Sequence, residues 1–156
     1  MSFSSFVRGR ADLLAYVPLA LATTAADVIG RHRTHAATKV ALAPALAAGV
    51  LATRSQRCPK RTATLVTALV GSTVGDWWMY RSSRAEGDES RRLMRRGASA
   101  FGVQQIGLIG LLLHDGARPR PVPSAIAATT LAGLAVLDTD GGAPDPVLTG
   151  YGLLLC

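Results

Sequence analysis

The sequence predicts an all-α fold, a polytopic transmembrane helix bundle with about five full spans and an incomplete sixth. Of the 156 residues, 49% are hydrophobic and only 17% are charged, whereas roughly a quarter of the residues in soluble domains carry a charge. The charges gather in six short clusters, at residues 8–12, 31–39, 54–61, 81–96, 114–120 and 138–145. The stretches between these clusters are nearly free of charge, as expected where a charge in hydrocarbon is costly.

Five apolar segments are each long enough, near the lower limit, to cross a hydrocarbon core of about 30 Å. They cover residues 13–29, 37–53, 62–80, 97–113 and 122–137. The first follows Arg8 and Arg10 and resembles a secretory signal, but because further apolar segments follow, we expect a first span. The second contains Lys39 and Pro44, and neighbouring helices can satisfy the carbonyl that the proline leaves free.

Aromatic and small side chains agree with this bundle. The third segment ends at Trp77, Trp78 and Tyr80, whose amphipathic rings favour the depth of the lipid headgroups. Many spans carry Gly and Ala, which let helix backbones approach closely. The sixth apolar stretch starts at Pro146 and has only 11 residues, too few to cross. We therefore expect residues 1–156 to form a single transmembrane domain that is truncated at its C-terminal side, in a bacterial cell membrane.

Other classes of protein fit less well. The net charge of +7 would suit a nucleic-acid-binding protein, but no basic binding module is recognisable, so we expect no nucleic acid partner. Cys58 and Cys156 have no motif spacing, and His32, His35 and His114 are read as solvated loop residues. We expect no metal and no cofactor. A homo-oligomer stays open, as does orientation, because the basic residues divide almost evenly between the two sides.

Three ionisable residues lie inside the apolar segments, and all three fall on one membrane face. Asp27 is near the end of the first segment, Lys39 near the start of the second and Asp76 near the end of the third. Intramembrane charges mark a functional site with a partner by default, although snorkelling to the headgroups is the alternative. Gln105 reaches toward the same face from the fourth segment, and Trp77 fixes the depth of Asp76.

At these residues the chain resembles the YhhN-like lysoplasmalogenases, a family of multi-span membrane proteins. Asp27 matches the family's Asp in the first span, Lys39 its Lys that opens the second, and Gly75-Asp76 its Gly-Asp that closes the third. In the fourth span Gly97 and Phe101 match, but Gln105 and Leu108 stand where the family has His and Tyr. Val40 replaces a Pro of the family, and its late Ser-Asp signature has no match here.

The resemblance implies hydrolysis of the vinyl ether bond of a lysoplasmalogen-like lipid to a fatty aldehyde and a glycerophospho-alcohol. The partners would then be the lipid bilayer and a lysophospholipid-like substrate. Asp76 is the expected proton donor and Asp27 the second catalytic carboxylate, while Lys39, Gln105 and Trp77 are expected to bind substrate. Two alternatives stay open: a small-molecule or proton-coupled transporter, whose charges would spread across the membrane depth, and a non-catalytic membrane protein.

Overall fold

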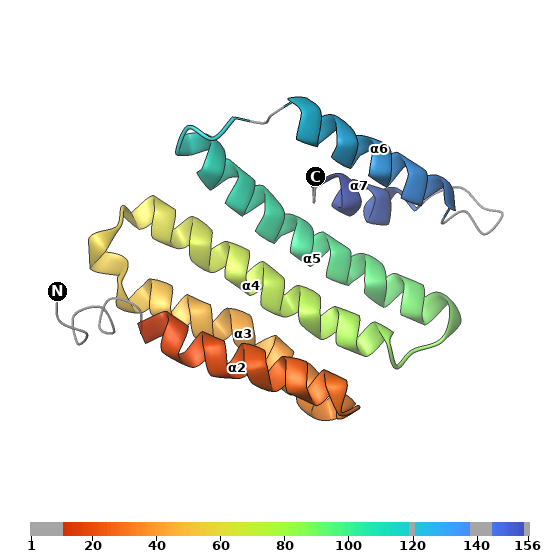
Figure 1. Cartoon of the computed structure of the whole chain (residues 1–156), viewed down its shortest axis with the longest axis horizontal. Helices are drawn as coiled ribbons and strands as arrows, with labels where there is room; N and C mark the ends of the chain where they lie inside the picture. The colour runs from red at the N-terminus through yellow and green to blue at the C-terminus, as the bar shows by residue number, and fades with distance from the viewer. Residues whose placement is uncertain (1–10, 119–120, 138–144, 155–156) are drawn as a thin grey trace.

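The computed structural model describes residues 11–118, 121–137 and 145–154, and within these ranges it contains helices and no strand. Figure 1 shows their arrangement. The helices are α2 (Ala11–Val28), α3 (His32–Ala52), η1 (Arg54–Gln56), α4 (Pro59–Ser82), α5 (Gly87–His114), α6 (Pro121–Leu137) and α7 (Pro146–Leu154). The all-α prediction is therefore confirmed, and one α-helix overlaps each of the six apolar stretches.

Two helices begin five or more residues before their apolar stretches. The prediction placed their starts at residues 37 and 97, whereas α3 begins at His32 and α5 at Gly87. Hydropathy detects only the part of a helix that suits hydrocarbon, while the backbone hydrogen bonds of a helix continue through polar side chains. The histidines at the start of α3 and the arginines between residues 91 and 96 are consequently helical, not in loops.

Glycines terminate two of the helices. After α2, Gly30 has a φ of 70°, and the Arg31 N–H donates to the Ala26 carbonyl at 2.8 Å. After α5, Gly116 has a φ of 86°, and the Ala117 N–H donates to the Leu112 carbonyl at 2.9 Å. This 6→1 pattern satisfies carbonyls that the end of a helix leaves free, and it requires a residue that adopts positive φ easily.

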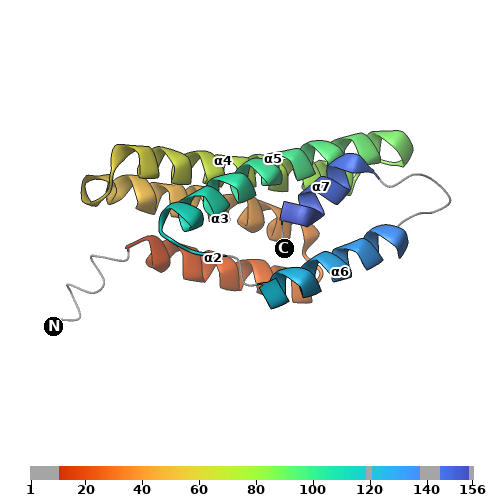
Figure 2. The same cartoon turned by 90° about the horizontal axis from the view of Figure 1, so that it is seen from above.

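Helices that follow one another from α2 to α5 pack side by side (Figure 1). Since each runs back along the one before, the end of α2, the start of α3, the end of α4 and the start of α5 lie at the same end of the molecule. The short α7 packs against α5, and α6 packs against α7. Figure 2 shows α6 set apart from the layer that α4 and α5 form.

Small residues make the contacts between helices. Of the five buried apolar residues described, four are alanines: Ala26, Ala43, Ala68 and Ala98. Fourteen of the large apolar side chains described are exposed, Leu21, Val28 and Ile106 among them, and Leu93 is the large one that is buried. This is the reverse of a water-soluble domain, in which large apolar residues fill the interior.

Two described helices are both long and apolar enough to cross a membrane, α3 and α5. Only 11% of the apolar window of α3 and 17% of that of α5 is buried, so neither resembles the core helix of a soluble protein. The five predicted full spans are not matched by five such helices. The apolar part of α2 described, Ala15–Val28, is shorter, α6 has 17 residues, and α4 contains many Thr and Gly residues beside Asp76.

Candidate functional site

Asp76 and Lys39 meet between α4 and α3. The Lys39 Nζ lies 3.8 Å from an oxygen of the Asp76 carboxylate. The Asp76 side chain is 11% exposed and that of Lys39 is 51% exposed, so the carboxylate is shielded while the ammonium reaches outward. The preceding residue, Gly75, is buried against the ring of Phe101, and a Cβ built there would come within 2.8 Å of that ring. The close approach of α5 thus fixes α4 at the position of Asp76.

A groove with a volume of about 490 Å³ opens beside this pair. Five of its lining residues come from the start of α3 and five from the end of α4 and the turn after it. They are His32, His35, Ala36, Lys39 and Val40, and Asp76, Met79, Tyr80, Ser83 and Arg84. Both sets follow the spacing i, i+3, i+4, i+7, i+8, so each is one face of a helix. The groove is therefore the space between two facing helical surfaces.

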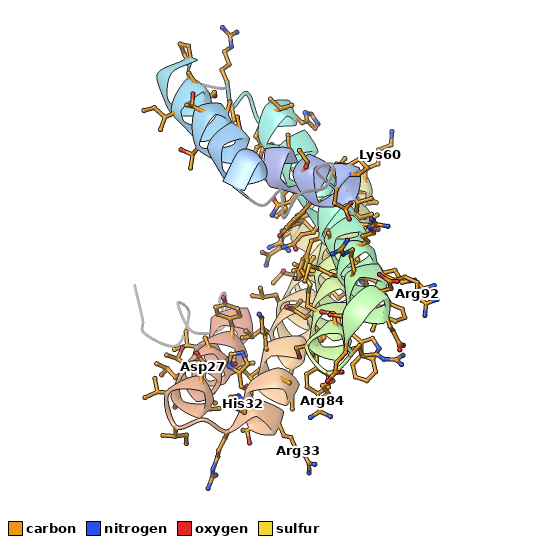
Figure 3. The ribbon with its side chains drawn as sticks, turned by 90° about the vertical axis from the view of Figure 1, so that its right-hand side faces the viewer. Asp27, His32, Arg33, Lys60, Arg84 and Arg92 are labelled. Atoms are coloured by element: carbon orange, nitrogen blue, oxygen red, sulfur yellow. The ribbon has the colours of Figure 1, made fainter. Side chains whose placement is uncertain are left out.

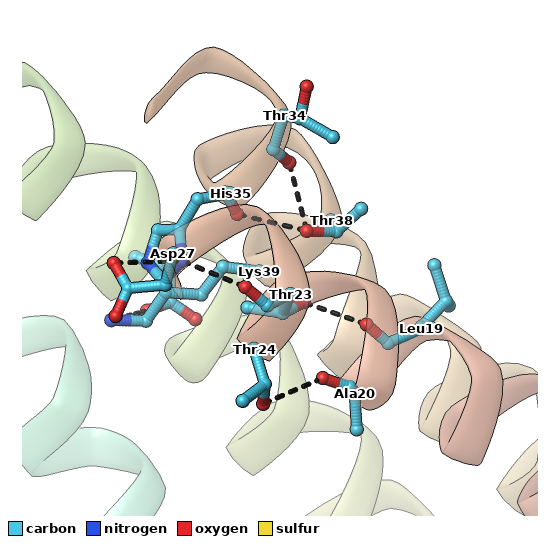
Figure 4. A network of polar contacts seen from close by, with 10 residues as sticks. Leu19, Ala20, Thr23, Thr24, Asp27, Thr34, His35, Thr38 and Lys39 are labelled. Atoms are coloured by element: carbon cyan, nitrogen blue, oxygen red, sulfur yellow. Dashed lines mark hydrogen bonds and ion pairs between the residues drawn. The ribbon is translucent and has the colours of Figure 1, made fainter. Parts of the chain in front are cut away.

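Asp27 contacts His35 and does not line the groove. Its carboxylate is 3.6 Å from the His35 Nδ1, and the Asp27 side chain is 67% exposed (Figure 4). The same Nδ1 is 3.2 Å from the backbone carbonyl of Thr23 on α2. A carbonyl only accepts hydrogen bonds, so this contact assigns a proton to Nδ1. The structure thus brings Lys39 to Asp76, and Asp27 to His35.

Trp77 and Gln105 lie away from the groove. Trp77 is 47% exposed and lines a second hollow of about 370 Å³ with Tyr80, Arg81 and Arg84, among others. Gln105 is half-buried on α5 and does not line either hollow. The two hollows share Tyr80 and Arg84, which therefore stand between them.

His32 and His35 are two of the lining residues that the sequence prediction missed. The prediction treated them as solvated loop residues, but both belong to the first turns of α3 and line the groove. Their spacing carried the signal, since His32, His35 and Lys39 recur at intervals of three and four residues. Had the predicted helix begun at His32 instead of residue 37, both histidines would have been placed on the helix face that carries Lys39.

Arginines stack on the aromatic side chains around the second hollow. The Arg84 guanidinium carbon is 4.4 Å from the centroid of the Tyr80 ring. Arg81 and Arg96 lie over the Trp78 ring at 5.7 and 5.2 Å. Cation–π contacts of this kind hold a guanidinium in place while its N–H edge stays available. In Figure 3, which looks onto this end of the molecule, Asp27, His32 and Arg84 come from neighbouring segments.

The C-terminal helix is fixed to α5 near the same region. The Tyr151 and Phe101 rings lie 5.9 Å apart between centroids. Arg95 forms an ion pair with Asp145, whose carboxylate also accepts a hydrogen bond of 3.0 Å from the Val147 N–H. Within the part of the chain that the structure describes, no three His, Cys, Asp or Glu side chains are grouped as a metal site.

A family model matches most of the chain, from residue 34 to residue 156. It describes the YhhN family, and the matched range includes Lys39, Asp76 and the whole of α4 and α5. No curated protein and no solved structure matches the chain. This is the family that the sequence resembles at Lys39, Gly75-Asp76 and Gly97. The chain belongs to the YhhN family.

Proposed function

We propose that the chain is a multi-span protein of a cell membrane that hydrolyses the vinyl ether bond of a lysoplasmalogen-like lipid. The membrane assignment is supported by the alanine-rich contacts between helices and by the large apolar side chains that face outward. In this arrangement α2 to α5 each cross the bilayer, and the end with Asp27, Lys39 and Asp76 lies at one lipid–water interface.

One observation carries the enzymatic proposal: a shielded carboxyl, Asp76, lines a groove whose other lining residues are partly apolar and partly basic. Ala36, Val40 and Met79 suit the start of an acyl chain. Arg84 suits the phosphate of a headgroup, since Lys39 is paired with Asp76. A lysolipid at this depth would present its ether bond between the two.

The chemistry needs a proton donor and a water molecule. The Asp76 carboxyl gives its proton to the outer carbon of the double bond, and the electron pair of the ether oxygen forms an oxocarbenium cation. The Asp76 carboxylate, now charged, stabilises this cation. Water adds to the cationic carbon and returns a proton to Asp76. The hemiacetal then collapses to a fatty aldehyde and the free hydroxyl of the glycerophospho-alcohol.

Within this proposal Asp27 does not act on the substrate directly. Its carboxylate meets His35, and His35 lines the groove. Asp27 therefore acts as a positioning residue that orients the His35 ring. Lys39 keeps the ionised form of Asp76 paired in each cycle.

The test is aldehyde release from a lysoplasmalogen by the full-length protein in detergent micelles. Asp76→Asn keeps the shape of the side chain but removes the acid, so the rate should fall by about 100-fold or more. Asp115→Asn is the matched control, because Asp115 pairs with Arg61 at the opposite end of α4 and should leave the rate unchanged. Equal rates for the wild type and Asp76→Asn would exclude Asp76 as donor. Uptake of a solute into proteoliposomes without chemical change would favour the transporter instead.

A further inference from the structure

Arg84 holds a position that no other basic residue of the groove shares. It follows the end of α4 and lines both the groove beside Asp76 and the second hollow beside Trp77. Its guanidinium lies over the Tyr80 ring, a cation–π contact that holds the group in place. A ligand that extends from one hollow to the other has to pass this side chain.

The hydrogen-bonding edge of Arg84 is not taken up by a carboxylate. The ion pairs of the described residues are His35–Asp27, Lys39–Asp76, Arg61–Asp115 and Arg95–Asp145, and none involves Arg84. Glu89 also lines the second hollow, but none of these four ion pairs joins Glu89 to Arg84. Lys39, the other permanent cation of the groove, is already paired with Asp76. Arg84 is therefore the permanent cation of the groove that is available to a bound anion.

The spacing along α4 suits a phosphate ester. Tyr80 is one helical turn beyond Asp76, or about 6 Å along the helix axis. The three-carbon glycerol unit between an ether oxygen and a phosphate has a similar length. A lipid whose ether bond lies at Asp76 would thus bring its phosphate to the guanidinium stacked on Tyr80.

We infer that Arg84, held on the Tyr80 ring, is the subsite for the phosphate group of the lysolipid and selects phosphate-bearing lipids over neutral glycerol ethers. A guanidinium matches two phosphate oxygens with two parallel N–H donors, and this geometry gives more selectivity than a point charge. The inference rests on the proposed function for the identity of the lipid. The binding site itself can be tested without catalysis.

The experiment measures binding of two uncleavable lipids to the purified full chain in a neutral detergent. The hexadecyl ether of glycerophosphoethanolamine carries the phosphate, and hexadecylglycerol lacks it. Arg84→Gln should weaken binding of the phosphate-bearing lipid by about tenfold or more, because a charge-assisted hydrogen bond is lost. Binding of hexadecylglycerol should not change. Arg84→Lys, which keeps the charge but not the paired donors, should fall between.

Arg81→Gln is the matched control. Arg81 is also an arginine stacked on an aromatic ring, but it lines only the second hollow. It should keep the affinity of the wild type. An equal loss in Arg81→Gln, no loss in Arg84→Gln, or an equal loss for hexadecylglycerol would each overturn the assignment. Inorganic phosphate should bind more weakly than the lysolipid, and equal or tighter binding would overturn the lipid as its source.

The outcomes also separate this inference from the proposed activity. Arg84-dependent binding by a protein that cleaves no vinyl ether would support the subsite and contradict the hydrolase. Cleavage with an unchanged KM in Arg84→Gln would support the hydrolase and contradict the subsite.

Discussion

At the level of single residues, Asp76 and Lys39 differ in how much water they reach. The carboxylate is nearly enclosed, while half of the lysine side chain is exposed. A shielded charge without a partner is costly, whereas an exposed ammonium can turn to water. The ion pair therefore stabilises the shielded Asp76 carboxylate more than it stabilises the exposed Lys39 ammonium.

Lys39→Met should lower the free energy of unfolding by about 1–2 kcal/mol, because it leaves the Asp76 carboxylate without its charged partner. In an Asp76→Asn background the same substitution should have little effect, since no charge remains to pair. Thermal unfolding of the four proteins in detergent gives the coupling directly.

Arg61→Met provides the comparison. Arg61 forms a bidentate pair with Asp115 at 2.6 and 2.9 Å, but both side chains are more than 40% exposed. Its loss should cost less than about 1 kcal/mol. A larger effect for Arg61→Met than for Lys39→Met would contradict the role given to shielding.

The sequence predicted part of this site. Depth alone placed Asp27, Lys39 and Asp76 toward one membrane face, because antiparallel helices alternate direction. Depth does not give the rotation of a helix about its axis, so it could not show that Asp27 meets His35 while Lys39 meets Asp76. Arg84 lies outside the apolar segments, where hydropathy carries no information about a groove.

At the level of elements, α4 and α5 pack closely through glycine and alanine. A Cβ at Gly71 would lie 2.8 Å from the Ala100 carbonyl oxygen, and one at Gly107 would lie 3.3 Å from the Ala68 Cβ. Backbone atoms cannot turn aside as a flexible side chain can. The small residues therefore set the distance between these helices.

Gly71→Ala should separate α4 from α5 and lower the free energy of unfolding by about 1–3 kcal/mol, as overpacking does elsewhere. Gly110→Ala is the control on α5, because nothing lies within 4 Å of a Cβ built there. It should be neutral or stabilising by up to about 1 kcal/mol, since alanine favours a helix. Equal unfolding midpoints for the two variants would show that the contact at Gly71 does not hold the helices together.

The apolar segments predicted that each of the α-helices exists. They placed the first residues of α3 and α5 too late in the sequence. The extra turns of α3 and α5 carry His32, Arg33, Arg92 and other polar side chains. Such residues are compatible with a helix outside hydrocarbon. Between Gly30 and the predicted start at residue 37 there is no glycine or proline that would delay the helix. The turn signal at Gly30 was a better guide to the start of α3 than its hydropathy.

At the level of the whole molecule, many large apolar side chains face outward. Val17 and Leu21 of α2, and Val103 and Ile106 of α5, are all 48% exposed or more. Large apolar side chains that are exposed in such number are typical of contact with a membrane or a partner. In the proposed membrane arrangement, lipid chains cover these side chains.

Cysteine labelling tests whether α4 crosses the bilayer. Cys58 is exposed just before α4, and Glu86 is exposed in the turn after it. Two proteins with one cysteine each are compared: Cys156→Ser keeps Cys58, and Glu86→Cys is made with both Cys58 and Cys156 changed to Ser. In cells, a membrane-impermeant maleimide should label one of these two proteins but not the other. The 24 residues of α4 span about 36 Å, enough to separate the two sides. Labelling of both sites in unpermeabilised cells would exclude a crossing α4.

The two tryptophans of the chain, Trp77 and Trp78, are adjacent at one end of α4. Trp78 lies beneath two guanidinium groups and Trp77 lines the second hollow, so the pair samples two surroundings that are only one peptide bond apart. All indole emission of the protein therefore originates from this end. Its wavelength and its quenching by brominated acyl chains would report the depth of the site in the bilayer, without a label attached to the chain.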